Sequence, residues 1–219
     1  GYPGGAIMPV YDELYKFKDQ LQHVLVRHEQ GATHAAQGFA RATGKVGVAI
    51  ATSGPGATNL VTGIADAQID STPMVCITGQ VGKHLLGSDA FQETDIFGIT
   101  LPIVKHSYTV RETHRLPKIL AEAFFLAQNG RPGPVLIDIT KDAQFEEFDF
   151  SYQKCIGIRS YKPVPVVDKK QIEAASALIN SAKQPLIVWG QGVILSEAEE
   201  IFKALVEKSG IPSAWTILG

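Results

Sequence analysis

The amino-acid sequence predicts an α/β protein built on a doubly wound parallel sheet. Short apolar runs alternate with segments in which apolar residues recur every three or four positions, which is the rhythm of consecutive β-α-β units. The runs are apolar throughout rather than at alternate positions, as expected for strands that helices cover on both faces. We therefore expect a central parallel sheet with helices on both sides.

The first domain is expected to span residues 1–142. Its helix at 30–43 has small and apolar residues spaced by three and four positions from Ala32 to Ala40, and Gly44 is placed to end it. The expected elements, in order, are a strand at 24–26, a helix at 30–43, strands at 47–51 and 74–78 with a helix at 59–69 between them, a helix at 116–128 and a strand at 135–139.

The rhythm fails between residues 143 and 168, where aromatic residues alternate with acids and two prolines interrupt regular structure, so we interpret 143–168 as a linker. Residues 169–219 are expected to begin a second α/β domain, with helices at 170–182 and 197–209 and strands at 186–189 and near 212–216. Ser196 and Glu199 have the spacing of a capping box, and Gly210 is placed to end the second helix. Two strands are too few for a stable sheet, which predicts that this domain is truncated.

Composition and charge favour a small-molecule ligand. The 219 residues are 45% hydrophobic and 19% charged with a formal net charge of -2, which is typical of a globular protein and argues against nucleic acid or an anionic membrane as partner. Cys76 lies in an apolar run and Cys155 in the linker, so we expect no disulfide and a reducing, cytoplasmic location. The six histidines have no metal-ligand spacing, and no metal site is expected here.

Glu29 is the first candidate for chemistry, because it stands between the expected strand at 24–26 and the expected helix at 30–43. A carboxylate fixed at such a turn is positioned to act on a ligand. The alternative is that Glu29 only complements the positive end of the helix dipole, an effect worth about 0.3 to 1 kcal/mol.

Two glycine-rich turns follow strands and are candidates for ligand contact. Residues 52–59, Thr-Ser-Gly-Pro-Gly-Ala-Thr-Asn, let backbone amides approach a ligand, although neither a P-loop nor the three-glycine dinucleotide fingerprint is present. A tight strand-to-helix connection without a ligand explains them equally well. The turn Gly190-Gln191-Gly192 is a weaker signal, and plain turn chemistry is the alternative.

Residues 79–93 follow the strand at 74–78 at its carboxyl end, where open α/β sheets bind ligands. Phe91 and Gln92 are the candidates in this segment. The alternatives are that Phe91 packs in the core and that Gln92 is a solvated amide.

Six motifs stand in order along the chain: 2–6 (YPGGA), 27–32 (RHEQGA), 52–59 (TSGPGATN), 78–81 (TGQV), 89–93 (DAFQE) and 130–135 (GRPGPV). Together they resemble the catalytic subunit of acetohydroxyacid synthases, also called acetolactate synthases, which are thiamine-diphosphate enzymes. The resemblance covers about residues 1–142 in order and extends to the start of that family's central domain. It implies that the first strand and helix of the initial domain are absent, as is the domain that holds magnesium and the diphosphate.

The resemblance implies a pyrimidine-binding domain in which Glu29 bonds a ring nitrogen of thiamine diphosphate. A carboxyl group in an apolar crevice can share a proton with that nitrogen, which favours the tautomer that deprotonates the thiazolium carbon. Pyruvate is then decarboxylated, and the two-carbon unit adds to a second 2-keto acid in branched-chain amino-acid synthesis.

The resemblance also implies roles for further residues, cofactors and partners. Gln92 joins Glu29 as a catalytic residue, and Phe91 and Lys141 belong to the substrate channel, although Lys141 could equally be an exposed strand-end lysine. FAD is an expected cofactor, as is Mg²⁺, whose ligands would lie outside this chain. Homodimers or tetramers and a regulatory small subunit are the expected partners. The residues expected at the cofactors are Gly5, Glu29, Pro55, Asn59, Arg131, Gly190 and Gly192.

Two alternatives remain open. Another thiamine-diphosphate enzyme, such as a pyruvate oxidase, glyoxylate carboligase or 2-keto-acid decarboxylase, would share most of these motifs. The chain could instead be a non-catalytic association module. Gly82, where the family often has proline, and Lys83-His84 depart from the family pattern and put the shape of the channel in doubt.

Overall fold

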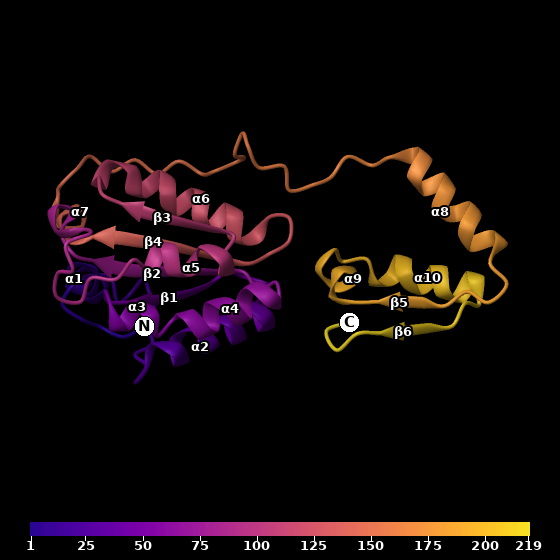
Figure 1. Ribbon diagram of the computed structural model, residues 1–219, viewed down its shortest axis with the longest axis horizontal. Coiled ribbons are helices and arrows are strands. Elements are labelled where there is room, and N and C mark those ends of the chain that lie inside the picture. Colours follow the sequence, from indigo (N-terminus) through magenta and orange to yellow (C-terminus); the bar gives the residue numbers. More distant parts are fainter. The chain divides into compact units, whose positions relative to one another are not determined.

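A computed structural model describes all of residues 1–219 and divides them into two units, Gly1–Val164 and Pro165–Gly219. The larger unit is an α/β structure around one parallel sheet (Figure 1). The predicted fold class is therefore confirmed. No helix in the chain is both long enough and apolar enough to cross a lipid bilayer.

The sheet has four strands in the order β1-β2-β4-β3, and every neighbouring pair is parallel. Parallel neighbours need crossover connections, which the intervening helices provide. The pairing places Gly47 beside Met74, Met74 beside Pro134, and His106 beside Val135. The strands are β1 (Gly47–Ala51), β2 (Met74–Gln80), β3 (His106–Val110) and β4 (Pro134–Thr140).

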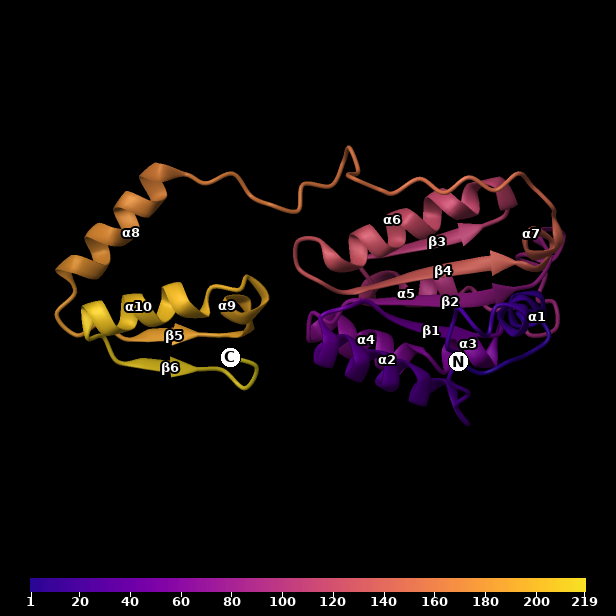
Figure 2. The same cartoon turned by 180° about the vertical axis from the view of Figure 1, so that it is seen from behind.

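Helices cover both faces of the sheet (Figures 1 and 2). One face packs against α2 (Glu29–Thr43), α3 (Pro55–Thr58), α4 (Val61–Ile69) and α5 (Ile96–Thr100). The opposite face packs against α6 (Leu116–Gln128) and α7 (Lys141–Phe145), and α1 (Met8–Lys16) contacts α7. The short 3₁₀ turns are Lys83–Leu85, Leu101–Ile103 and Thr113–Arg115.

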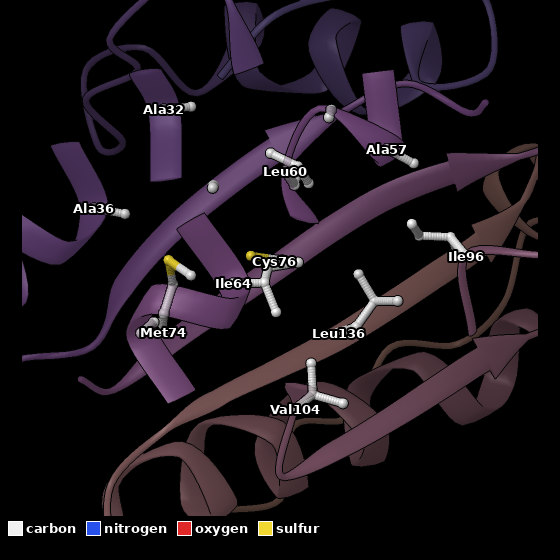
Figure 3. Close-up of a cluster of buried hydrophobic side chains, with 13 residues drawn as sticks. Ala32, Ala36, Ala57, Leu60, Ile64, Met74, Cys76, Ile96, Val104 and Leu136 are labelled. Atoms are coloured by element: carbon white, nitrogen blue, oxygen red, sulfur yellow. The ribbon is translucent and has the colours of Figure 1, made fainter. Parts of the chain in front are cut away.

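Alternation along β2 divides the core into two layers. Met74 and Cys76 point to the α2 and α4 side, where they meet Leu136 of β4 (Figure 3), whereas Val75 points to the α6 side. Cys76 is fully buried and has no disulfide partner, as the sequence predicts, and burial raises the pKa of its thiol to about 12. This cysteine is therefore a core residue with no thiolate available for chemistry.

The carboxyl ends of β2 and β4 form the place where an open α/β sheet binds ligands. The chain leaves β2 towards α5 on one face and leaves β4 directly into α7 on the other, so the connections of these two adjacent strands diverge. Such a divergence opens a crevice beyond the strand ends. Gln80 and Thr140 are paired at this edge.

Two local predictions are wrong. Residues 24–26 are irregular rather than a strand, because Val24 and Val26 exchange hydrogen bonds only with Gly1 and join no ladder. Residues 143–145, which were assigned to the linker, belong to α7. The helix expected at 59–69 is α4, which begins two residues later and is preceded by the separate short helix α3. The sequence interpretation also omitted α1, α5 and β3, an edge strand whose single neighbour is β4.

The smaller unit is one β-α-β crossover preceded by a helix. Its strands β5 (Ile187–Trp189) and β6 (Ser213–Trp215) are parallel, and the connection between them contains α9 (Gln191–Leu195) and α10 (Glu199–Ser209). Asp168 is the N-cap of helix α8 (Lys169–Ser181), and its side chain accepts a hydrogen bond from the Lys170 amide.

The capping box expected in the smaller unit is absent. Ala198 is the N-cap of α10, whereas Ser196 is the C-cap of α9 and its hydroxyl donates to Gly192 O within that helix. Ser196 is used by α9 because that helix ends where α10 was expected to begin. Gly210 ends α10 in the left-handed conformation, with φ 66°, as predicted.

Candidate functional site

Glu29 is the first residue of α2, and its side chain is buried, with 7% of the residue exposed. The helix begins there because His28 acts as N-cap: its Nδ1 accepts a hydrogen bond from the Gln30 amide at 3.1 Å. One carboxylate oxygen, Oε2, accepts a hydrogen bond from Asn59 Nδ2 at 2.9 Å. No donor in the chain is bonded to the other oxygen, Oε1. The pairing with Asn59 goes beyond the dipole interaction that was the simpler explanation of Glu29.

The glycine turn after β1 brings the backbone close to Glu29 Oε1. Gly54 has φ 53°, a backbone conformation that glycine adopts readily, and α3 starts at the next residue, the exposed Pro55. A Cβ on Gly56 would lie 3.2 Å from Glu29 Oε1 and 2.7 Å from the Thr52 side chain. The lack of a side chain at Gly56 therefore lets its backbone pack closely against Thr52 and the carboxylate.

A second glycine segment, residues 4–7, crosses the carboxyl end of β2. The Ala6 amide donates to Thr52 Oγ1 at 3.2 Å, and Gln144 Nε2 of α7 donates to Ala6 O at 2.8 Å. Gly79 of β2 makes this close approach possible, because a Cβ there would lie 2.6 Å from the Ala6 carbonyl carbon. A Cβ on Gly5, in contrast, would have no neighbour within 4 Å. The backbone at Gly5 is thus accessible to a ligand.

Tyr11 of α1 lies beside Glu29, and sequence reasoning missed it. Burial, followed by the charge of Glu29, raises the pKa of Tyr11 to about 12, so its hydroxyl stays protonated at neutral pH. The hydroxyl oxygen is buried without a hydrogen-bond partner. The only sequence signal was its position six residues after Gly5, on a helix that was itself not predicted.

The segment of residues 81–94, between β2 and α5, brings Gln92 to the glycine turn. Gln92 has φ 59°, and its backbone packs closely on Gly54. A Cβ added to Gly54 would lie 3.0 Å from the Gln92 carbonyl carbon. Phe91 is 87% exposed, so the alternative that it packs in the core of this chain is wrong. The structure therefore places Gln92 near the Gly54–Gly56 turn and leaves the Phe91 ring available for contact.

Glu93 holds the 81–94 segment in a compact turn. Its carboxylate accepts hydrogen bonds from the amides of Gly87, Ser88 and Ala90. These bonds, the one from Gly87 above all, lower the pKa of Glu93, so the carboxylate stays charged and the turn stays closed over the neutral pH range.

The remaining predicted site residues lie elsewhere. Lys141 is exposed at the start of α7, and its amide donates to Val81 O. The Arg131 side chain donates to Ser71 Oγ and to the carbonyls of Gln68 and Ile69, which lie just before the amino end of β2. Arg131 is therefore at the opposite end of the sheet from Glu29 and Gly79.

Gly190 and Gly192 belong to the smaller unit, where they flank the start of α9. A Cβ on Gly192 would meet nothing within 4 Å, whereas one on Gly190 would approach Thr216 Oγ1 at 3.0 Å. The backbone at Gly192 is thus open to a ligand.

The chemistry available at this site is hydrogen bonding and proton sharing by one carboxyl group. Glu29 is buried, Asn59 fixes one of its oxygens, and the other oxygen lies beside Gly56 without a hydrogen-bond donor. Such a group can bond a ring nitrogen of a heterocycle. No group of three or more His, Cys, Asp or Glu side chains is arranged to hold a metal ion.

Comparison with known proteins gives two family matches. Residues 1–99 match the thiamine pyrophosphate enzyme N-terminal TPP binding domain, and residues 172–219 match the thiamine pyrophosphate enzyme central domain. Both matches fall on regions that the fold assigns to α/β structure.

The chain is also similar to curated acetolactate synthases. It is 57% identical over 218 residues to an acetolactate synthase large subunit of Corynebacterium glutamicum, covering all of this chain and 35% of the relative. It is 54% identical over 223 residues to the large subunit of Pyropia yezoensis and to an acetolactate synthase of Arthrospira platensis, covering 38% of each. The chain thus spans little more than a third of the length of these relatives.

Proposed function

The chain belongs to the thiamine pyrophosphate enzyme family, and from that premise we propose that it is the N-terminal part of an acetolactate synthase catalytic subunit. The whole enzyme would decarboxylate pyruvate and join the two-carbon unit to a second 2-keto acid. The observation that carries the proposal is the buried Glu29 carboxylate with one oxygen fixed by Asn59 and the other without a partner.

The residues around Glu29 fit the aminopyrimidine ring of thiamine diphosphate. Glu29 Oε1 would bond a ring nitrogen and hold a proton there, and Asn59 would keep the carboxyl group oriented. The backbone at Gly56, which has no side chain beside Glu29 Oε1, would border the ring. The open backbone at Gly5 and the exposed Pro55 would lie along the cofactor. When bound, thiamine diphosphate supplies the electron sink that decarboxylation of a 2-keto acid requires.

We assign Phe91, Gln92 and Lys141 to the substrate side of the same site. The packing of Gln92 on Gly54 supports a position near the reacting atoms, where its amide could orient the keto acid. The exposed Phe91 ring would exclude water from that region. Lys141 begins α7 next to the 81–94 segment and would attract the substrate carboxylate at the mouth of the channel.

Flavin and magnesium belong to the same proposal. Two features, one in each unit, are separate candidates for contact with FAD: the positive charge of Arg131 in the larger unit and the open backbone at Gly192 in the smaller unit. Yellow colour and flavin fluorescence released on denaturing the intact protein would test this, and a colourless intact protein would contradict it. Magnesium would be held by residues outside this chain.

We further propose a homodimer or tetramer. Val24 and Leu25, a few residues before Glu29, are 62% and 60% exposed, and an apolar surface next to a site favours a subunit contact there. Sedimentation of the intact protein and of a Leu25→Glu variant would test this, because the charge should weaken the association. Co-purification would test a regulatory small subunit, and cell fractionation a cytoplasmic location, which the free thiols of Cys76 and Cys155 support.

The decisive experiment is Glu29→Gln in the intact protein that contains this chain. The amide keeps the shape but cannot share a proton in the same way, so turnover should fall at least about 100-fold. Asp66→Asn is the matched control, because it removes an exposed carboxylate on α4 and should leave turnover unchanged. Circular dichroism should be the same for all three proteins. Full turnover in Glu29→Gln would falsify the assignment and would favour an association module.

Product analysis with pyruvate separates the neighbouring activities. Acetolactate supports the proposal, whereas acetaldehyde would indicate a decarboxylase and acetyl phosphate a pyruvate oxidase.

A further inference from the structure

Asp138, in the middle of β4, is a buried carboxyl group with no part in the site described above. The residue is 2% exposed, and its two oxygens accept hydrogen bonds from two β2 side chains. Thr78 Oγ1 donates to Oδ1 at 2.6 Å, and Gln80 Nε2 donates to Oδ2 at 3.0 Å. A carboxylate in such a place is costly unless its hydrogen bonds are satisfied, so its neighbours are under tight geometric control.

The Gln80 side chain has only one orientation that satisfies its surroundings. Its Nε2 donates both to Asp138 and to the Thr94 carbonyl, the latter at 2.9 Å, while its Oε1 accepts from the Val81 amide at 2.9 Å. Turning the amide over would place Nε2, a donor, against the Val81 amide, which is also a donor. It would place Oε1, an acceptor, against the Thr94 carbonyl, which is also an acceptor. Asp138 therefore helps to keep the Nε2 atom of Gln80, rather than its Oε1 atom, directed at Thr94.

The bond to Thr94 ties down the far end of the 81–94 segment. The near end is held by Asp142, which accepts a hydrogen bond from the Lys83 amide at 2.8 Å. Between these anchors Asp89 and Gln92 have φ 55° and 59°, conformations that are costly for residues other than glycine and persist only where the surroundings impose them. The anchors thus maintain a backbone shape that the segment would not adopt alone.

We propose that Asp138 and Gln80 form a positioning pair: Asp138 orients the Gln80 amide, and Gln80 anchors Thr94, so that Gln92 rests on Gly54 beside the Glu29 site. The functional part of this inference rests on the proposed function. Neither residue touches the reacting atoms; their effect reaches the site through the 81–94 segment. Burial raises the pKa of Asp138 to about 7, against the opposing effect of its hydrogen bonds from Thr78 and Gln80.

The test swaps the carboxyl group of Asp138 and the amide group of Gln80 between the two positions in the intact protein. Gln80→Glu alone places two carboxyl groups against each other and should destabilise the sheet. Adding Asp138→Asn restores a donor and an acceptor, because the new amide at position 138 can donate to the new carboxylate at position 80, and the Val81 amide keeps its acceptor. Thr94 O, however, regains no donor from position 80. The double variant therefore repairs the pair without repairing the anchor.

Three measurements follow from this design. The melting temperature of the double variant should rise above that of Gln80→Glu but stay below the wild-type value, since the hydrogen bonds within the pair are restored while Thr94 O faces an acceptor instead of a donor. Amide hydrogen exchange within residues 81–94, measured without substrate, should be at least about tenfold faster, because the segment loses one of the bonds that hold it closed. The value of kcat/KM for pyruvate should fall at least about tenfold, while the Kd of thiamine diphosphate changes less than about threefold, because Glu29, Gly56 and Asn59 are unaltered.

Ser107→Ala is the matched control for a purely structural role. It removes a buried hydrogen bond between Ser107 and Thr100, on β3 and α5, without touching the 81–94 segment. It should lower the melting temperature without changing exchange in 81–94 or kcat/KM.

The inference is overturned if the double variant regains wild-type exchange and kcat/KM, because the pair would then act only in stability. It is also overturned if activity falls while exchange in 81–94 is unchanged. Should the double variant fail to fold, Gln80→Met takes its place, since it removes the anchor and leaves Thr78 bonded to Asp138; the same exchange and kinetic outcomes decide. Amide hydrogen exchange is measured without turnover. If Glu29→Gln left activity unchanged, the proposed function would be refuted, whereas the exchange measurement would still test whether Gln80 anchors the 81–94 segment.

Discussion

Gly79→Ala is expected to displace the Gly4–Ile7 segment and to destabilise the larger unit. The new Cβ would lie 2.6 Å from the Ala6 carbonyl carbon and 2.9 Å from the Ile7 amide nitrogen, where ordinary contacts are 3.4 to 4 Å. All of these neighbours are backbone atoms, so no side-chain rotation relieves the clash. Either β2 or the segment must move by about 1 Å, a typical overpacking strain.

The magnitude follows from what holds the segment. Moving it weakens the bonds from Ala6 N to Thr52 and from Gln144 to Ala6 O, each worth about 1 kcal/mol, and loosens the fully buried Ile7 by about 1 to 2 kcal/mol. The free energy of unfolding should therefore fall by about 2 to 4 kcal/mol. For a unit of this size the melting temperature should fall by about 5 to 15 °C.

Thermal unfolding followed by far-ultraviolet circular dichroism measures this effect. Gly5→Ala is the matched control: it adds the same methyl group to the same segment with no atom within 4 Å, and it should change the melting temperature by less than about 2 °C. Equal melting temperatures for Gly79→Ala and the wild type would refute the close approach of Ala6 to Gly79.

Other substitutions test the helix, the buried acid and the arginine. Gly38→Ala, on the exposed face of α2 with no atom near the added Cβ, should raise the free energy of unfolding by about 0.5 to 1 kcal/mol in a urea titration; a decrease would contradict this. The pKa of Asp138 is raised from 3.8 to about 7, so its contribution to stability is greatest below about pH 4 and is lost as pH rises through about 7. Relative to Asp138→Asn, the wild type should lose up to about 4 kcal/mol between pH 4 and pH 8, and parallel pH profiles would count against this burial. Arg131→Ala should lower the melting temperature by a few degrees even without flavin, because the side chain holds the carboxyl end of α4; an unchanged value would leave ligand contact as its role.

The elements that were predicted correctly are those whose local signals agree with their burial. The central strands are apolar throughout because both of their faces are covered, and α2 carries a small-residue stripe and a left-handed Gly44 at its end. Edge elements were harder to predict. Strand β3 contains His106 and other polar residues because only one neighbour pairs with it, whereas Val24 and Leu25 look like a strand but lie exposed.

Part of the candidate site could be derived from short-range patterns. Glu29 was found because it starts a helix, and the turn at 54–56 because glycines follow a strand. The pairing of Glu29 with Asn59 joins residues 30 positions apart, and sequence spacing alone predicts no such bond. Tyr11, Thr52 and Asp138 were missed because each gains its role from a partner that is remote in the sequence or from burial.

By itself the sequence determined the rhythm of strands and helices, the glycines at the turns and the acid at the start of α2, because propensity and periodicity are local properties of the chain. Only the tertiary structure decided which oxygen of Glu29 is free, which glycines allow backbones to touch, and that Asp138 and Gln80 meet beneath the 81–94 segment. Those features depend on the order and register of parallel strands. Packing of the whole sheet sets that order, and no short stretch of residues contains it.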